Sequence, residues 1–315
     1  MDRNLALEFV RVTEAAAIEA AKWIGRGDKN AADQAAVDAM RKRLNQIDFK
    51  GVVVIGEGEK DKAPMLYNGE VVGRGSDLEM DLAIDPLECT SSVAYGRYNA
   101  MAVIATGSKG SLFSAPDTYM NKIAVGKEAK NVINLEAPVE VNLKKIAKAK
   151  GKDVKELVVM VLDRERHISL IGEIRKVGAR VRLITDGDVS SAIATCFPDS
   201  GIDVAMGIGG STEAVLAAVA IKILGGEILC HFKPKTKEDE KRIFQKTGLK
   251  NLKKIFTSND LAKGKELSFT ATGVIEGPLL KGVVFSKERI ITHSLAIRGV
   301  SGTIRYINTY HHYYQ

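Results

Sequence analysis

The chain has 315 residues, of which 45% are hydrophobic and 27% are charged. These proportions are typical of a globular protein, and the length allows two domains, or one large α/β unit, with ample core. No apolar run reaches the roughly 18 residues that a membrane-spanning helix needs, which excludes a membrane protein of that kind.

The chain has three cysteines, Cys89, Cys196 and Cys230, and they form no C-x-x-C pair. So sparse a set argues against a disulfide scaffold and favours a reducing, cytoplasmic compartment. Lysine and arginine exceed aspartate and glutamate by 46 to 39, a net charge of +7, which suits either an anionic small substrate or nucleic acid. Much of the excess lies in 231–256, where acids and apolar residues are interspersed, so we expect a solvated face or an insertion there rather than a nucleic-acid surface.

The first third of the chain reads as two helices followed by strands. Apolar residues recur three or four positions apart in 5–23 and on one face of 30–47, which predicts two amphipathic helices. The segments 51–56 and 80–85 are short and apolar, as is typical of buried strands. Pro86 has no N–H to donate, so it is expected to end the second strand.

Strands and helices alternate with short links through the middle of the chain. Strands are predicted at 155–163, 179–187 and 201–210, and a helix follows each of them. This alternation favours parallel strands with right-handed crossovers, and ligands bind at the carboxyl ends of such strands. The residues at or just beyond these strand ends are Asp163, Arg164, Arg166, Asp186, Asp188 and Glu213.

Pairs of carboxylates follow both apolar strands of the first third. Glu57 and Glu59 come directly after one strand, and Asp85 and Glu88 come at the end of the other. Hard divalent cations such as Mg²⁺ and Mn²⁺ take oxygen ligands, and gathering carboxylates without a cation would be costly. The alternative is that each pair is a solvated loop end. The histidines lack metal-ligand spacing, so a zinc site is not expected.

Thr90 lies two residues beyond Glu88. Its hydroxyl could hold a metal-bound water in line for attack, or it could cap the helix that follows. The two roles are compatible.

A glycine-rich turn, "GIGGSTEA" at 207–214, precedes the helix that follows the third parallel strand. Backbone N–H groups at such a turn favour an anion. The chain has no G-x-x-x-x-G-K-[ST] segment and no dinucleotide fingerprint, which weighs against a nucleotide enzyme. Arg164 and Arg166 could bind phosphate bidentately, or they could be a surface pair.

The segment "DPLECT" (85–90) resembles the D-P-[IL]-[DE]-G-[ST] signature of the lithium-sensitive, metal-dependent sugar and inositol phosphatases. A wider set of segments is similar, in order, to the class II fructose-1,6-bisphosphatases, from the N-terminal helix to near residue 310. These segments are "GRGDKNAAD", "VVVIGEGEKDKAPMLYNGE", "DLAIDPLECT", "GSLFSAPDTYMNKIAVG", "ITDGDVSSAI" and "GIGGSTEA".

The resemblance implies a layered α/β/α/β/α sandwich of the sugar-phosphatase type. We expect an N-terminal metal-binding α+β half, 1–140, and a C-terminal α/β half, 141–315, with parallel strands and substrate loops. The implied enzyme is a cytoplasmic phosphoric monoester hydrolase of gluconeogenesis, a homodimer or homotetramer. It would cleave the 1-phosphate of fructose-1,6-bisphosphate with water activated by two or more Mn²⁺ or Mg²⁺ ions.

The resemblance also assigns roles to individual positions. Asp33 and Glu57 would bind one divalent ion, and Asp85, Glu88 and Glu213 would bind a second. Thr90 would orient the attacking water, with Lys29 and Asp61 beside the centre. The implied substrate site consists of Glu88, Cys89, Thr90, Tyr119, Arg164, Arg166, Asp186, Gly187, Asp188 and Gly210.

The chain departs from the family pattern at two places. Cys89 replaces a glycine that would suit a positive φ or close approach to phosphate. We expect an ordinary backbone there that tolerates cysteine; the alternatives are a narrowed, slow site and a redox-sensitive thiol. Ser211 and Thr212 replace Ala-Pro, and either could cap the helix that carries Glu213.

Two other classes of function stay open on the sequence. One is the same chemistry on sedoheptulose-1,7-bisphosphate or on another sugar or inositol phosphate. The other is a non-catalytic protein that binds a ligand at the site altered by Cys89, or nucleic acid through 231–256.

Overall fold

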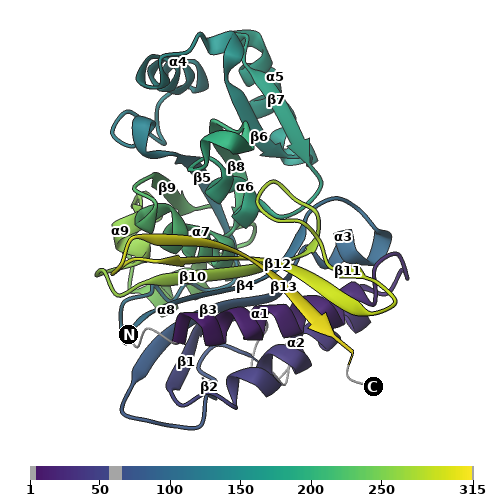
Figure 1. Cartoon of the computed structure of the whole chain (residues 1–315). Helices are drawn as coiled ribbons and strands as arrows, with labels where there is room; N and C mark the ends of the chain where they lie inside the picture. The colour runs from purple at the N-terminus through teal and green to yellow at the C-terminus, as the bar shows by residue number, and fades with distance from the viewer. Residues whose placement is uncertain (1–4, 57–65, 314–315) are drawn as a thin grey trace. The chain divides into compact units, whose positions relative to one another are not determined.

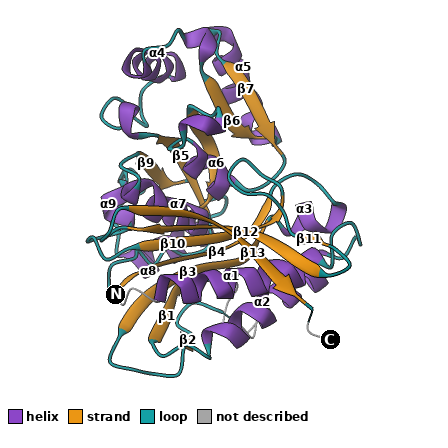
Figure 2. Ribbon diagram, viewed as in Figure 1, coloured by secondary structure: helices purple, strands orange, loops and turns teal. Residues whose placement is uncertain are grey.

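The computed structural model describes residues 5–56 and 66–313. The chain forms two compact units, each a mixed α/β structure (Figures 1 and 2). Unit 1 comprises Met1–Leu112 and Lys263–Gln315, and unit 2 comprises Phe113–Ala262. The α/β class expected from the sequence is confirmed. Among the described helices, none combines the length and apolar character that a membrane crossing requires.

Unit 1 is built on an eight-stranded sheet. The strand order is β11-β12-β10-β4-β3-β1-β2, with β13 paired to β12. Strands β1 and β3 are parallel, and the other pairs are antiparallel. Its elements are α1 (Leu5–Ala21), α2 (Lys29–Leu44), β1 (Lys50–Ile55), β2 (Val71–Val72), β3 (Glu79–Glu88), α3 (Thr90–Tyr95), β4 (Ala100–Ser108), β10 (Ser268–Ile275), β11 (Val284–Phe285), β12 (Arg289–Arg298) and β13 (Thr303–His312).

Helices α1 and α2 lie along one face of this sheet (Figure 1). Phe9 of α1 meets Phe49 edge to face, with ring centroids 5.6 Å apart, and both side chains are fully buried. Met40 of α2 and Leu82 of β3 belong to the same apolar cluster. Both predicted N-terminal helices are therefore confirmed, and their apolar faces form the core of unit 1.

Unit 2 is built on a five-stranded sheet in the order β7-β6-β8-β5-β9. Strand β6 is parallel to β7 and β8, whereas β5 is antiparallel to β8 and β9. Its elements are β5 (Tyr119–Val125), η1 (Lys127–Ala129), α4 (Val139–Lys150), η2 (Val154–Glu156), β6 (Val158–Leu162), η3 (Glu165–His167), α5 (Ile168–Val177), β7 (Arg180–Ile184), α6 (Asp188–Ala194), η4 (Pro198–Ser200), β8 (Val204–Gly210), α7 (Ser211–Ile223), β9 (Glu227–Phe232), α8 (Lys237–Thr247) and α9 (Ser258–Leu261).

The predicted alternation of strands and helices is confirmed for β6 through α7. Alternate residues along the strands of unit 2 face different helices. Ile123 and Val159 pack in one cluster with Ile146 of α4 and Ile174 of α5, whereas positions of the other parity line a pocket with α6 and α7. Helix α6 begins just after the carboxyl end of β7, and α7 begins at the carboxyl end of β8.

The two units differ from the halves 1–140 and 141–315 expected from the sequence. The boundary at residue 140 falls within α4 of unit 2. The C-terminal strands belong to unit 1 because β10 pairs with β4 along most of its length. Such pairing between distant segments leaves no local mark in the sequence.

Candidate active site

Asp85 and Glu88 lie near the end of β3, a strand flanked by β1 and β4. Their exposed fractions are only 6% and 3%. The backbone N–H of Leu87 donates to Oδ1 of Asp85 at 3.1 Å, which fixes that carboxylate against its own strand. Two nearly buried carboxylates thus lie three positions apart.

The expectation that Pro86 ends this strand is wrong. Strand β3 continues to Glu88, and its register against β4 shifts between Asp85, opposite Val103, and Glu88, opposite Met101. The shift is a β-bulge, a position where a proline without an N–H is tolerated. The bulge lets the strand carry both carboxylates before the chain turns into α3.

Cys89 has a left-handed backbone, with φ of 79° and ψ of 50°. The expectation of an ordinary backbone is therefore wrong, since this region favours glycine and costs other residues about 1–2 kcal/mol. Asn99, whose φ is also positive at 71°, donates from Nδ2 to Sγ of Cys89 at 3.9 Å. The cysteine thus occupies a conformation suited to the family's glycine, in contact with Asn99.

Thr90 is the first residue of α3, and Cys89 is the N-cap residue, without a side-chain cap. The interpretation of Thr90 as the helix cap is therefore wrong. Thr90 is partly exposed and lies two residues beyond buried Glu88. The role as a water-orienting group stays a prediction.

Lys29 and Asp33 both lie in the first turns of α2, which begins at Lys29. The N-cap is Asp28, whose Oδ1 accepts from the N–H of Ala31 at 3.0 Å. One helical turn separates Lys29 from the half-buried Asp33. The predicted residues Glu57 and Asp61 lie outside the described residues.

The predicted ligands suit a hard divalent ion. Asp33, Asp85 and Glu88 offer carboxylate oxygens only, which Mg²⁺ and Mn²⁺ prefer. Within 5–56 and 66–313, no three His, Cys, Asp or Glu side chains gather closely enough to enclose a metal. The donor chemistry therefore fits such an ion, while the described residues form no complete cage.

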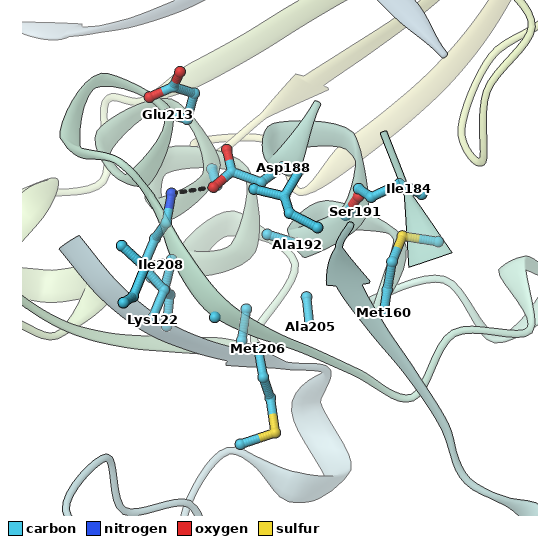
Figure 3. A pocket seen from close by; sticks show the side chains of 15 residues that line it. Lys122, Met160, Ile184, Asp188, Ser191, Ala192, Ala205, Met206, Ile208 and Glu213 are labelled. Carbon is cyan, nitrogen blue, oxygen red and sulfur yellow. Dashed lines mark ion pairs between the residues drawn. The ribbon is translucent and has the colours of Figure 1, made fainter. Parts of the chain in front are cut away.

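In unit 2, Lys122 connects the beginnings of α6 and α7. Its Nζ lies 2.5 Å from Oδ2 of Asp188, the first residue of α6 (Figure 3). The same Nζ donates to the carbonyl of Gly210 at 2.8 Å. The two charged side chains are only 11% and 17% exposed. Sequence reasoning missed Lys122, although a lysine inside the apolar strand β5 is a signal that could have found it.

The glycines of "GIGG" are needed for close packing. A Cβ at Gly209 would overlap the carboxylate of Asp188, and one at Gly210 would overlap the side chain of Glu213. Gly187, the N-cap of α6, has a positive φ of 84°. Backbone and carboxylates therefore approach one another here more closely than a side chain would allow.

Glu213 lies in the first turn of α7 and lines the same pocket as Lys122 and Asp188 (Figure 3). Burial raises the pKa of Glu213 to about 7, and the negative charge of Asp188 adds to the rise, while Lys122 opposes it. The anionic form of Glu213 is thus held less readily than in water, as expected of a carboxylate withdrawn from solvent.

Ser211 does not cap α7, so that expectation is wrong. It is the first residue of the helix, after Gly210 as N-cap. Its Oγ donates to the carbonyl of Pro116 at 2.6 Å and accepts from the N–H of Thr118 at 3.1 Å. The hydroxyl instead attaches the segment before β5 to the start of α7.

Tyr119, Arg166 and Gly210 lie together. Tyr119 pairs with Gly210 between β5 and β8. The Cζ atom of Arg166 is 5.1 Å from the Tyr119 ring centroid, and its Nε and Nη2 donate to the carbonyl of Ile208 at 3.2 and 2.9 Å. The structure thus brings three predicted substrate residues to one place in unit 2.

Arg164 and Asp186 form a second contact in unit 2, with Nη2 and Oδ1 3.8 Å apart. Burial raises the pKa of Asp186, while the Arg164 guanidinium opposes that rise. Asp186 and Asp188 flank Gly187 at the start of α6. The predicted sugar-site residues therefore lie around the strand ends of unit 2.

The buried side chain of His167 forms hydrogen bonds to the backbone at the ends of two strands of unit 2. It is 1% exposed, its Nδ1 donates to the carbonyl of Leu162 at 2.8 Å, and its Nε2 accepts from the N–H of Ile208 at 2.7 Å. Burial lowers the pKa of His167, and the charges of Arg166 and Arg164 add to that effect. The imidazole thus joins the end of β6 to β8.

Residues 3–311 match the family model described as bacterial fructose-1,6-bisphosphatase, glpX-encoded. The fructose-1,6-bisphosphatase 1 class 2 of Escherichia coli (strain K12) is 45% identical over 323 residues, covering 99% of this chain and 96% of that protein. The fructose-1,6-bisphosphatase class 2 of Shigella flexneri gives the same values.

Among solved structures, an extragenic suppressor from Pyrococcus furiosus is similar with a TM-score of 0.32 and 11% identity, covering 60% of this chain and 68% of its own. The suppressor protein SuhB from Bartonella henselae has a TM-score of 0.30 and 13% identity, covering 59% and 72%. The family assignment rests on the sequence matches, which extend over almost all of the chain. The chain belongs to the glpX-encoded family of bacterial fructose-1,6-bisphosphatases.

Proposed function

We propose that this protein hydrolyses the 1-phosphate of fructose-1,6-bisphosphate to fructose-6-phosphate and phosphate, as a cytoplasmic enzyme of gluconeogenesis. The observation that carries the proposal is 45% identity to a class 2 fructose-1,6-bisphosphatase over 99% of the chain. The buried carboxylates of β3 and the arginines at the strand ends of unit 2 suit a metal-dependent reaction on a phosphate ester.

Two or more Mn²⁺ or Mg²⁺ ions are the proposed cofactors. Their proposed ligands are the carboxylates of Asp33, Glu57, Asp85, Glu88 and Glu213. When bound, such ions lower the pKa of water and neutralise charge on the leaving oxygen. The position of Asp85 and Glu88 supports this role, since both are nearly buried carboxylates three positions apart on β3, and carboxylate oxygens are the ligands that these ions prefer.

Thr90 is proposed to orient the attacking water by a hydrogen bond from its hydroxyl. Its place at the start of α3, two residues after Glu88 at the end of β3, supports this. Lys29 and Asp61 would assist beside the centre. The backbone of 88–90 would contact the scissile phosphate, and Cys89 would provide the left-handed turn that directs the chain into α3.

The sugar and its second phosphate are proposed to contact residues of unit 2. The contacts between Arg166 and Tyr119 and between Arg164 and Asp186 support a preorganised site, because they hold long side chains in place before a ligand arrives. The proposed residues are Tyr119, Arg164, Arg166, Asp186, Gly187, Asp188 and Gly210. A homodimer or homotetramer is proposed as the assembly.

The first test is phosphate release from fructose-1,6-bisphosphate with Mn²⁺, with Mg²⁺ and with a chelator, in the presence of a reducing agent. We expect metal-dependent release that exceeds release from sedoheptulose-1,7-bisphosphate and inositol phosphate. A higher rate on either of those would reassign the substrate. Absence of release from all three, by folded protein, would overturn the phosphatase assignment.

A variant pair tests the metal site. Glu213→Gln should lose most metal-dependent turnover while remaining folded, because it replaces a proposed ligand by an amide of the same shape. Glu173→Gln is the matched control, since Glu173 is exposed on α5. Near-normal turnover by Glu213→Gln would contradict the proposed ligand set.

A further inference from the structure

Two cations from different segments flank the ring of Tyr119. The Cζ atom of Arg166, in η3, lies 5.1 Å from the ring centroid, and Nζ of Lys235, just beyond β9, lies 4.0 Å from it. The backbone adds a link, since the N–H of Lys233 donates to the carbonyl of Tyr119 at 2.8 Å. Three segments far apart in the sequence therefore meet at one aromatic ring.

Arg166 is held in place by the protein and still has donors to offer. Both Nε and Nη2 donate to the carbonyl of Ile208, so the guanidinium is anchored to the end of β8. Its Nη1 group is not used in those bonds, and a guanidinium has five N–H donors in all. The side chain is exposed, so the remaining donors are accessible to a ligand.

Neither Arg166 nor Lys235 forms an ion pair with a carboxylate within 5–56 and 66–313. A ring attracts each cation through its quadrupole but leaves the charge in place, and the two cations repel each other. An anion that contacts both would remove that repulsion.

We propose that Lys235 is a further substrate-binding residue, which together with Arg166 and Tyr119 binds the phosphate that is not hydrolysed, the 6-phosphate. This inference rests on the proposed function. The scissile phosphate takes its positive charge from the metal ions, whereas the second phosphate of a bisphosphate has only side chains to neutralise it. A lysine and an arginine that flank a tyrosine ring supply those charges and donors.

The competing explanation is that the lysine stem merely covers the ring of Tyr119. Lys235→Met separates the two, because methionine retains an unbranched apolar stem and loses the charge. Lys235→Arg keeps the charge. The matched control is Lys254→Met, since Lys254 is likewise exposed and its Nζ lies 4.7 Å from the ring centroid of Phe256 in the same unit.

The experiment compares two monophosphates that each carry one of the two phosphate groups. Binding of fructose-6-phosphate and binding of fructose-1-phosphate are both measured by calorimetry. Lys235→Met should weaken fructose-6-phosphate binding about tenfold, as expected for a lost charge-assisted hydrogen bond, and leave fructose-1-phosphate within twofold. Lys235→Arg should bind within threefold of wild type, and Lys254→Met should equal wild type.

Unchanged fructose-6-phosphate binding by Lys235→Met would overturn the proposal, and so would an equal loss for both monophosphates. Failure of the proposed function has a different signature, which is absence of fructose-1,6-bisphosphate turnover by the wild-type enzyme. The calorimetric comparison is still decisive in that case, because it needs no turnover.

Discussion

The ammonium group of Lys122 lies 2.5 Å from a carboxylate oxygen of Asp188 and also donates to the carbonyl of Gly210. These partners are the first residue of α6 and the N-cap of α7. One lysine from β5 therefore fixes the starts of the two helices that carry proposed substrate and metal residues.

Lys122→Met should lower kcat/KM by at least tenfold and destabilise the protein by about 1–3 kcal/mol. The largely buried carboxylate of Asp188 would lose its counter-charge, which is costly. Steady-state kinetics and guanidinium unfolding measure both effects. Lys222→Met is the control, since Lys222 also donates to a carbonyl, that of Ala262 at 2.6 Å, and the change should affect stability alone. Equal kinetic losses in both variants would contradict the positioning role of Lys122.

Gly209→Ala should displace Asp188, because the added methyl group would overlap its carboxylate. We expect a loss of about 2 kcal/mol in the free energy of unfolding and at least a tenfold loss in turnover. Gly172→Ala provides the comparison, since Gly172 lies within α5 with open space around it. That change should stabilise the protein by about 0.5–1 kcal/mol. Wild-type stability and turnover in Gly209→Ala would show that the close packing is not needed.

Cys89→Gly should alter the free energy of unfolding by no more than about 1 kcal/mol. Relief of the left-handed backbone of Cys89 offsets the lost side chain and the greater freedom of glycine in the unfolded chain. Cys230→Gly, at a fully buried position of β9, should cost about 2 kcal/mol or more. Denaturant unfolding under reducing conditions compares the two variants. A cost for Cys89→Gly as large as that for Cys230→Gly would refute the account of its backbone.

His167 should make stability fall as the pH drops below about 6.5, the ordinary pKa of histidine. Burial lowers its pKa in the folded protein, so the unfolded chain takes up the proton first and acid favours unfolding. His167→Gln retains a donor and an acceptor without titrating, so its unfolding free energy should fall less between pH 7.5 and 5.5.

Urea unfolding at the two pH values checks this prediction. His312→Gln, at an exposed position of β13, is the control and should preserve the wild-type difference. A pH dependence in His167→Gln as steep as in the wild type would remove His167 as its source.

Much of the fold could be predicted because its signals are local. The alternation from β6 to α7 follows from apolar periodicity and turn residues within short segments. The pairing of β10 with β4, and the antiparallel insertion of β5 between β8 and β9, connect distant segments and were not predicted.

The residues of the candidate site likewise fall into those with a local sequence signal and those that depend on contacts between distant segments. Asp85, Glu88 and the arginines could be recognised because charged residues directly follow apolar strands, where ligands bind. Lys122 and Lys235 were missed because their significance depends on Asp188 and Tyr119, which are distant in sequence. The left-handed backbone of Cys89 was also predicted wrongly, since one residue's φ depends on the packing around it.

The sequence by itself determined the family, the α/β class and the types of side chain available for chemistry. Periodicity, motif order and residue type are properties of neighbouring positions, so they can be read without a structure. Only the tertiary structure decided which cation faces which carboxylate or ring, how β3 continues through Pro86, and which strands share a sheet. Those outcomes depend on contacts between distant segments, whose energies no local stretch of sequence contains.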